Sequence, residues 1–428
     1  MKVYLDTVGC RLNQSEIEKL ASQFRAAGHL IVETAAEADL VVVNTCSVTS
    51  EAAADSRKKT RQAARVGEAQ IILTGCWATL EPDEAAALPH VARVVPNSDK
   101  AMLAADWLHL PLADFDLEPL AREPLPGARM RTRAFIKVQD GCDNFCTFCI
   151  TRLARGKGIS RPMEEIRRDI QLALAGGVKE IVLTGVHLGS WGRDLEGRQT
   201  LRGLIETLLC ESGLERLRLS SLEPWDIDEH FFDLWQEQRL CRHLHLPLQS
   251  GSAAVLKRMA RKTTPELFAE IAAAARSAAP DMALTTDLIV GFPGETDAEF
   301  NEGLQFVREM QFSGGHVFSF SARPGTAAAR FTYQVPPAVR KRRSAELRAV
   351  VAESSLAYHR HFTGQVVNVL WETADKLGAD GWRLNGLTDN YMKVQALSLK
   401  PLWNEFSRVR LEHLKQDTFD GKILSDEA

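Results

Sequence analysis

The chain has 428 residues, 45% hydrophobic and 25% charged, with a formal net charge of −4 at pH 7. This composition is typical of a soluble globular protein with about three domains, and it excludes a chain that binds nucleic acid through a globally basic surface. No apolar run approaches membrane-spanning length, and the N-terminus lacks the apolar core of a signal peptide. We therefore expect a cytoplasmic protein without a membrane partner, in which eight cysteines serve metal binding or catalysis and not disulfides.

Residues 1–105 alternate short apolar strands with helices. The expected strands are 3–6, 40–44 and 71–74, and the expected helices are 13–27 and 51–66. Such an alternation predicts an α/β domain with a doubly wound parallel sheet, covered by helices on both faces.

One cysteine follows each of these strands: Cys10, Cys46 and Cys76. The carboxyl ends of parallel strands meet at one crevice, where ligands collect, so these thiols should converge in space. A single buried cysteine is commonly inert, but three at equivalent strand ends favour an iron–sulfur cluster.

A Pro-rich linker is expected over 106–131. From residue 132 onward a strand is followed by a helix six times, and each helix is long enough for a right-handed crossover. The expected strands are 135–138, 180–184, 216–220, 244–248, 284–290 and 317–320. Reacting groups should gather at the carboxyl ends of these strands.

Cys142, Cys146 and Cys149 form a C-x3-C-x2-C array directly after the first of these strands. Three thiolates can hold three irons of a four-iron cluster and leave the fourth open, as in a catalytic centre. The alternative is a zinc knuckle that lacks its fourth ligand. The array resembles the signature of the radical S-adenosylmethionine (SAM) enzymes, which implies a partial (β/α)6 barrel over 132–337 and SAM on the open iron.

The same resemblance implies SAM contacts at the strand ends. The candidates are Phe148, Thr184, Gly185, Ser221, Glu223, Gln249, Ile289 and Gly291. The alternative for Gly291 is an ordinary tight turn. His187, His243 and His245 are read either as a base or ligand or as histidines of the core.

The basic segment 151–158 lies beside the open iron, and Arg152, Arg155 and Lys157 are its candidate RNA contacts. A charge run is otherwise usually a solvated face. Ile159 stands where related enzymes often carry another arginine.

A charged helix is expected over 338–362, and a strand-rich tail over 363–428. The tail resembles the small β-barrel called TRAM, which implies a contact with the substrate macromolecule. The tail is not basic, so we do not expect it to bind RNA mainly through ion pairs with phosphates. The aromatic side chains would stack on bases instead, and the candidates are Trp382, Tyr391 and Trp403.

Three segments carry the most specific resemblance: 7–16 (Thr-Val-Gly-Cys-Arg-Leu-Asn-Gln-Ser-Glu), 44–49 (Asn-Thr-Cys-Ser-Val-Thr) and 74–76 (Thr-Gly-Cys). They resemble the N-terminal domain of the radical SAM methylthiotransferases, and the resemblance runs over essentially the whole chain. It implies two [4Fe-4S] clusters, one on Cys10, Cys46 and Cys76 and one on Cys142, Cys146 and Cys149. Two SAM molecules would be used per turnover, one as the source of the 5'-deoxyadenosyl radical and one as the methyl donor.

The segment around Cys10 is most like the branch that acts on N6-threonylcarbamoyladenosine at tRNA position 37. The implied partners are a tRNA anticodon stem–loop, a sulfur donor and a flavodoxin- or ferredoxin-like electron donor. Isopentenyladenosine in tRNA and an aspartate of a ribosomal protein are the alternative substrates within the family. A non-catalytic iron–sulfur protein that binds RNA or carries electrons is the alternative of another class.

Overall fold

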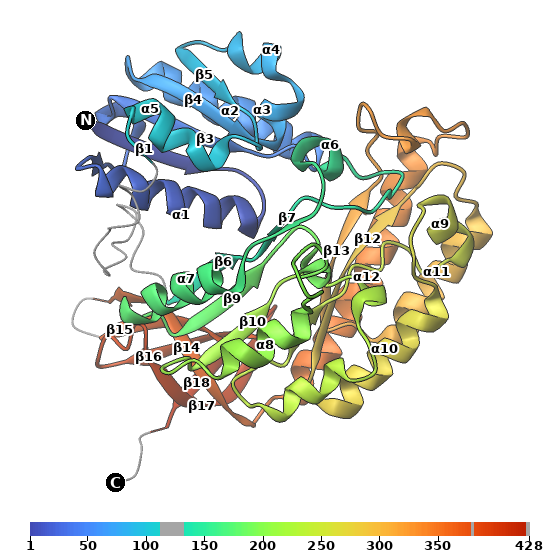
Figure 1. Ribbon diagram of the computed structural model, residues 1–428. Coiled ribbons are helices and arrows are strands. Elements are labelled where there is room, and N and C mark those ends of the chain that lie inside the picture. The colour runs from blue at the N-terminus through green and yellow to red at the C-terminus, as the bar shows by residue number, and fades with distance from the viewer. Residues whose placement is uncertain (112–131, 378–380, 425–428) are drawn as a thin grey trace.

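A computed structural model describes residues 1–111, 132–377 and 381–424. Figure 1 shows three bodies: an N-terminal domain, a central open barrel and a small C-terminal barrel. The prediction of an α/β chain with these three parts is confirmed.

The N-terminal domain is a parallel sheet of five strands in the order β2-β1-β3-β4-β5. Their bounds are Leu30–Ile31, Lys2–Thr7, Leu40–Thr45, Gln70–Gly75 and Val91–Val95. The helices are α1 (Arg11–Ala26), α2 (Ser50–Val66), α3 (Cys76–Leu80), α4 (Pro82–Ala86) and α5 (Leu103–Leu108). The apolar pattern predicts neither β2, which has only two residues, nor β5, whose residues at the exposed edge of the sheet are mostly accessible to solvent.

The central strand β3 explains why the sheet is doubly wound. All six of its residues are buried, because helices cover both of its faces. The even- and odd-numbered positions enter two separate apolar clusters, with Val42 in one and Val41 and Val43 in the other.

The central barrel consists of two three-stranded parallel sheets, β10-β9-β6 and β11-β12-β13. In chain order the strands are β6 (Arg133–Lys137), β9 (Glu180–Thr184), β10 (Arg216–Leu219), β11 (His243–His245), β12 (Ala283–Val290) and β13 (Gly314–Ser319). Isolated bridges, among them Ser221 to His245, join the two sheets into one open barrel. A short ribbon, β7 (Gln139–Asp140) with β8 (Ile159–Ser160), flanks the first strand.

Helices cover the outside of this barrel (Figure 1). They are α7 (Met163–Ala175), α8 (Leu201–Leu209), α9 (Ala253–Arg258), α10 (Pro265–Ala278), α11 (Asp297–Met310) and α12 (Pro337–His361), and α6 (Thr151–Arg155) follows the cysteine loop.

The structure departs from the expected pattern at three places. Two 3-10 segments, 224–226 and 231–236, replace the expected α-helix between β10 and β11. β11 ends at His245, two residues before Pro247, which has no N–H to donate to a ladder. Helix α12 does not simply lead out of the barrel, because Leu347, Val350 and Val351 belong to the barrel core.

The C-terminal body is a closed barrel of strands β14-β15-β16-β18-β17. Their bounds are Val366–Lys376, Trp382–Thr388, Lys393–Ser398, Thr418–Ile423 and Phe406–Lys415. Of the expected linker 106–131, residues 112–131 lie outside the described residues, and its first residues belong to α5.

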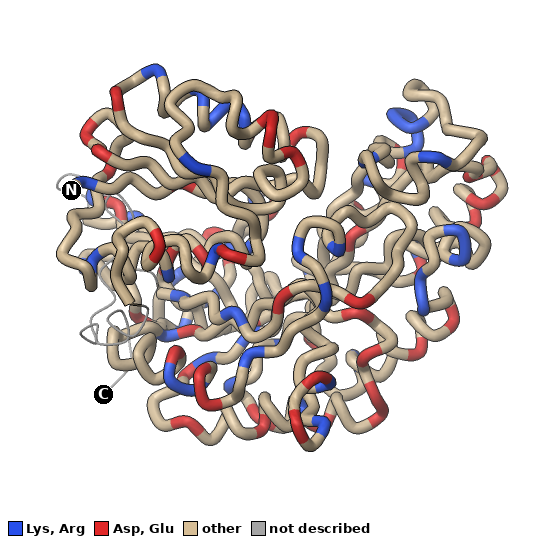
Figure 2. The backbone as a smooth tube through the Cα atoms, turned by 45° about the horizontal axis from the view of Figure 1, so that its top comes forward, with Lys and Arg blue, Asp and Glu red and all other residues tan. Residues whose placement is uncertain are grey.

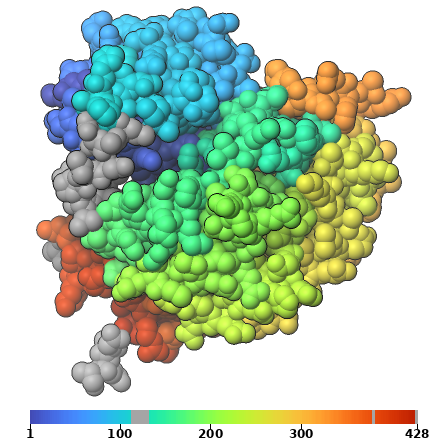
Figure 3. Space-filling model, in the orientation of Figure 1, coloured from blue at the N-terminus to red at the C-terminus, as the bar shows by residue number. Residues whose placement is uncertain are grey.

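The N-terminal domain lies over the carboxyl ends of the barrel strands. Arg323, after β13, donates to the Ser47 hydroxyl at 2.7 Å, and Asn97 donates to the Ala154 carbonyl at 2.7 Å. Figure 3 shows the two bodies packed together along one seam, with the C-terminal barrel on the opposite side. Among the described residues, no helix is long and apolar enough to cross a membrane.

Candidate functional site

The C-x3-C-x2-C array forms a compact loop after β7. The Cys149 amide donates to the Cys146 carbonyl at 3.1 Å, and the Cys142 amide donates to the Gly156 carbonyl at 3.1 Å. Gly141 allows this return of the chain, because its φ is +68° and an added Cβ would lie 1.7 Å from the Lys157 carbonyl oxygen.

Hydrogen-bond donors surround the three thiols. The Asn144 amide lies 3.4 Å from Cys142 Sγ, and Arg261 Nη1 lies 3.8 Å from Cys146 Sγ. Burial raises the pKa of the Cys146 thiol to about 11, although the Arg261 charge opposes this. A buried thiol forms a thiolate only where a cation or hydrogen-bond donors stabilise it, and the thiolate is the form that binds iron. The Asn144 amide and Arg261 supply this stabilisation, so the cysteine loop fits an iron–sulfur cluster.

His187 also lies beside the three thiols. It is buried, and its Nε2 lies 2.6 Å from the Asp226 carboxylate. Burial alone would lower the pKa of His187, but hydrogen bonds to Asp226 and Cys142 raise it to about 9. A positive charge on His187 therefore lies beside the first cysteine of the array.

Cys10, Cys46 and Cys76 come together beside the barrel: Cys46 and Cys76 directly follow β3 and β4, and Cys10 lies three residues after β1. Burial raises the pKa of the Cys46 thiol to about 11, and the neighbouring Cys10 and Cys76 add to the shift. Asn97 Nδ2 lies 3.7 Å from Cys76 Sγ, so this triad also has a donor. Three adjoining thiols with few other ligands fit a second cluster with an open iron.

Within the described ranges, no group of three or more Cys, His, Asp or Glu side chains is arranged to hold a single metal ion. A four-iron cluster takes one thiolate at each of three corners, so its ligands stand wider apart than those of one ion.

The predicted SAM contacts line the barrel mouth and the cysteine loop. Thr184 ends β9 and Gly185 follows it, while Ser221 bridges to β11. Glu223 forms an ion pair with Arg261 at 2.6 Å, beside Cys146. Phe148 and Ile289 pack against the same apolar cluster, which joins the cysteine loop to β12.

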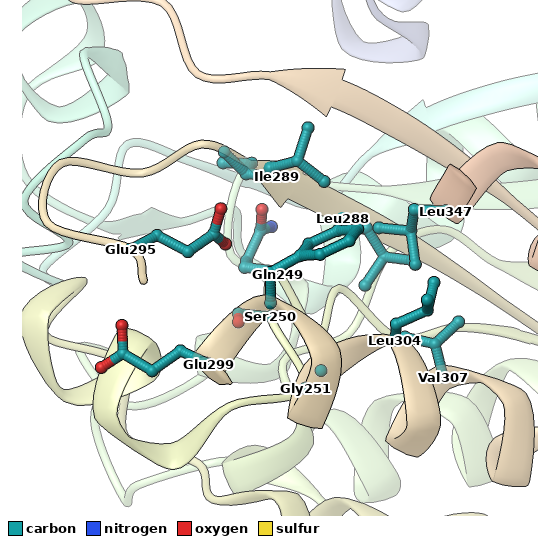
Figure 4. A pocket seen from close by; sticks show the side chains of 13 residues that line it. Gln249, Ser250, Gly251, Leu288, Ile289, Glu295, Glu299, Leu304, Val307 and Leu347 are labelled. Carbon is teal, nitrogen blue, oxygen red and sulfur yellow. The ribbon is translucent and has the colours of Figure 1, made fainter. Parts of the chain in front are cut away.

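Two of the predicted contacts have left-handed backbone. Gln249, at φ +73°, bonds the β12 backbone through its own amide and carbonyl. Gly291, at φ +68°, donates its amide to the Glu295 carboxylate at 2.7 Å, which is the tight turn considered from the sequence. A small pocket includes Gln249 and Ile289, but it lies between β12 and α11, with Leu347 of α12 at one side (Figure 4).

The side chains of the basic segment after the cysteine loop differ in their exposure to solvent. Arg152 lies over the Phe145 ring at 3.9 Å, and Phe145 is 72% exposed. Lys157 is also exposed. Arg155 is not presented to RNA, because its side chain is only 2% exposed and forms ion pairs with Glu16 and Asp140.

Glu16 is the centre of a buried polar cluster that the sequence analysis did not single out. Lys100 contacts its carboxylate at 2.7 Å, and Arg155 contacts it at 3.0 Å. Burial alone would raise the pKa of Glu16, but the three cations Lys100, Arg155 and Lys137 hold it well below its usual range. The sequence feature that could have indicated this cluster is the position of Glu16 itself, six residues after Cys10 and on the buried face of an expected helix.

Comparisons with known proteins agree with this arrangement. The model of the radical SAM superfamily matches residues 136–307, and that of the uncharacterized protein family UPF0004 matches residues 2–96. A threonylcarbamoyladenosine tRNA methylthiotransferase (MtaB) of Bacillus subtilis is 37% identical over 96% of this chain and 93% of the relative. The chain belongs to the radical SAM methylthiotransferase family. It is therefore a transferase.

Methylthiotransferases with two named substrates are similar to this chain. The MtaB of Thermotoga maritima is 37% identical over 98% of both chains. A tRNA-2-methylthio-N(6)-dimethylallyladenosine synthase of Cereibacter sphaeroides is 35% identical over 99% of this chain and 98% of the relative.

Solved structures support the fold. The radical SAM methyltransferase TsrM from Kitasatospora setae, with cobalamin and a [4Fe-4S] cluster bound, superposes with a TM-score of 0.56. It is 14% identical and the match covers 76% of each chain. The cobalamin-dependent radical enzyme OxsB gives a TM-score of 0.51 at 13% identity, over 77% of this chain and 54% of the other.

Proposed function

We propose that this enzyme converts N6-threonylcarbamoyladenosine at position 37 of tRNA into its 2-methylthio derivative, using two [4Fe-4S] clusters and two SAM per turnover. One observation supports the proposal: the thiols of Cys10, Cys46 and Cys76 lie close enough to interact, as do those of Cys142, Cys146 and Cys149, and Asn97 links the first triad to the segment after the second. Each triad offers three thiolates to a four-iron cluster, which leaves one iron open. Sulfur insertion at an inert C–H bond needs both centres near one substrate atom.

In this proposal Cys142, Cys146 and Cys149 hold the cluster that binds SAM, and Cys10, Cys46 and Cys76 hold the auxiliary cluster. When bound, these groups supply the electron for SAM cleavage and the sulfur for transfer. The chain orients SAM with Thr184, Gly185, Ser221, Glu223, Gln249, Ile289, Gly291 and Phe148. Arg261 would donate to the Cys146 sulfur and the His187 charge would lie beside Cys142, and neighbours of this kind tune the potential of a bound cluster.

The RNA partner is supported by the surface beside the first triad. Phe145 and Arg152 form an exposed aromatic–cation platform on which a base can stack, and Lys157 can meet a phosphate. Figure 2 shows both charge signs interspersed along the backbone, so RNA would be bound by such local features. A sulfur donor and a flavodoxin- or ferredoxin-like reductant complete the proposed partners.

The threonylcarbamoyl substrate is favoured over dimethylallyladenosine by the segment 9–16 and by the names of the 37% identical relatives. The test is nucleoside mass spectrometry of tRNA from a deletion strain, before and after this gene is restored. Loss and return of 2-methylthio-N6-threonylcarbamoyladenosine would support the proposal. Loss of the methylthio dimethylallyl nucleoside instead would contradict it.

A second assay separates the enzyme from a passive iron–sulfur protein. The purified chain is reconstituted anaerobically with iron and sulfide, then given dithionite, SAM and tRNA. We expect 5'-deoxyadenosine, and its absence with both clusters present would overturn the catalytic proposal.

A further inference from the structure

Arg11 extends from the start of α1 into the interior of the central barrel. Its guanidinium donates to the Tyr391 hydroxyl and lies 5.3 Å from the centre of that ring. Tyr391 in turn stacks on His243 of β11 at 4.7 Å and lies under Arg218 of β10 at 4.9 Å. Arg11 therefore places a cation in the lumen, although the residue before it is the cluster cysteine Cys10.

The lumen around Arg11 has more cations than carboxylates. Arg216 and Arg218 share the buried Glu180, and Arg133 pairs with Glu372 at 2.5 Å. In the part of the chain that the structure describes, Arg11 has no carboxylate partner within 4.0 Å. The only hydrogen bond of its side chain there is the one to Tyr391. A guanidinium has five N–H donors, so most of them are available to a ligand.

Unpartnered polar atoms at the same place point to a ligand. His243 Nδ1 and Ser220 Oγ are buried and have no hydrogen-bond partner, and their residues are 3% and 8% exposed. Arg133 Nη1 is a third such atom. Ser220 continues the face of β10 that carries Arg218, because side chains alternate along a strand. Buried polar groups normally have partners, so a polar guest accounts for these three atoms together.

The chemistry of the proposed substrate fits this position. Carbon 2 and the N6 substituent of adenine lie on the same edge of the base, on either side of N1. A group that recognises the substituent must therefore lie close to the auxiliary cluster, which transfers sulfur to carbon 2. Arg11 directly follows Cys10 and meets this condition. The threonylcarbamoyl group ends in a carboxylate and a hydroxyl, whereas the dimethylallyl group is apolar and neutral.

We propose that Arg11 binds the threonyl carboxylate of the substrate nucleoside in the barrel lumen, with Tyr391 holding the guanidinium in place. The inference rests on the proposed function and deepens it, because it names the residue that selects the substrate. A charge-assisted pair of this kind accounts for a preference of roughly ten- to a hundredfold over an uncharged analogue.

The test uses the anaerobically reconstituted enzyme and three anticodon stem–loop RNAs. They carry adenosine, threonylcarbamoyladenosine or its carboxyl methyl ester at the target position. Binding is measured by fluorescence anisotropy, and the product is identified by mass spectrometry. The proteins are the wild type, Arg11→Gln, Arg11→Lys and Tyr391→Phe, each with its iron content determined.

We expect the wild type to prefer the free carboxylate over the methyl ester by roughly ten- to a hundredfold. Arg11→Gln should lose this preference, and Arg11→Lys should keep part of it. The ester comparison needs no variant, so equal binding of acid and ester by the wild type would overturn the proposal even if Arg11→Gln fails to fold.

Two other results would also overturn it. In the first, Arg11→Gln keeps the preference for the acid. In the second, Arg11→Gln and Tyr391→Phe both lower the affinity for all three RNAs equally, which is expected if Arg11 only docks the C-terminal barrel. The proposed function fails separately: the wild type would then bind the RNAs but form no methylthio product from threonylcarbamoyladenosine.

Discussion

Arg155 and Glu16 lie 139 residues apart in the chain and form a buried ion pair, with 3.0 Å between Nη1 and Oε1. Arg155 ends the helix that follows Cys149, and Glu16 lies in the helix that follows Cys10. Arg155 Nη2 also donates to Asn13 Oδ1 at 2.6 Å. The pair therefore ties the segment after one cysteine triad to the segment after a cysteine of the other.

We predict that Glu16→Gln loosens the seam between the two domains. The change leaves the buried Lys100 without a carboxylate partner and Arg155 with Asp140 alone, which costs about 3–5 kcal/mol of stability. Hydrogen exchange of α1 and α6 should accelerate, and chemical denaturation should begin earlier. Glu51→Gln, at the exposed start of α2, is the control, and equal behaviour of the two variants would contradict the role of Glu16.

Gly9→Ala should remove the auxiliary cluster and spare the other one. Gly9 has φ +103°, and an added Cβ would lie 2.6 Å from Cys46 Sγ. Iron analysis after reconstitution should give about four irons per chain in place of about eight. Gly28→Ala is the matched control, because its φ is also positive, at +77°, but an added Cβ there would have nothing within 4 Å. Full iron loading of Gly9→Ala would show that the Cys46 thiol can move without cost.

The junction of the central and C-terminal barrels, where Arg218 donates to the Asp389 carbonyl at 2.9 Å, should be sensitive to acid. Burial alone would raise the pKa of Glu180, but Arg218, Arg216 and Arg133 lower it to about 2. A carboxyl group whose pKa is lower in the folded state stabilises the fold at pH values above its unfolded-state pKa of about 4.5. This stabilisation disappears as the pH falls from there toward 2. Limited proteolysis or denaturation at stepped pH should show the loss between these values.

Glu180→Gln tests the same junction at neutral pH. It leaves two buried guanidinium groups unpaired, so we expect a loss of about 3–5 kcal/mol. Glu215→Gln breaks the exposed pair with Lys179 and should cost less than about 1 kcal/mol. Equal losses in the two variants would contradict the structural importance of the buried pair.

Replacing both Arg152 and Lys157 with Ala should weaken tRNA binding without changing cluster content. Each lost phosphate contact makes the slope of log affinity against log salt less steep by about 0.7–0.9. The control is the double variant Arg168→Ala and Arg308→Ala, which removes two charges from exposed positions on the outer helices α7 and α11. A slope that falls equally in both double variants would place the RNA elsewhere.

The sequence by itself predicts which residues carry the metal chemistry. Short-range spacing defines the array of Cys142, Cys146 and Cys149, and strand periodicity places Cys10, Cys46 and Cys76 at equivalent ends of parallel strands. The order of the three domains could also be predicted, because hydrophobic periodicity is a local property of the chain.

The tertiary structure alone decided what the charged residues do. Arg152 and Arg155 are three positions apart in one basic segment, yet one lies over an exposed ring and the other is buried against Glu16. Likewise, nothing local distinguishes Arg11 as a cation inside the barrel. Its partner Tyr391 is 380 residues away, and the pairing of distant charges depends on how the domains pack and how much water they exclude.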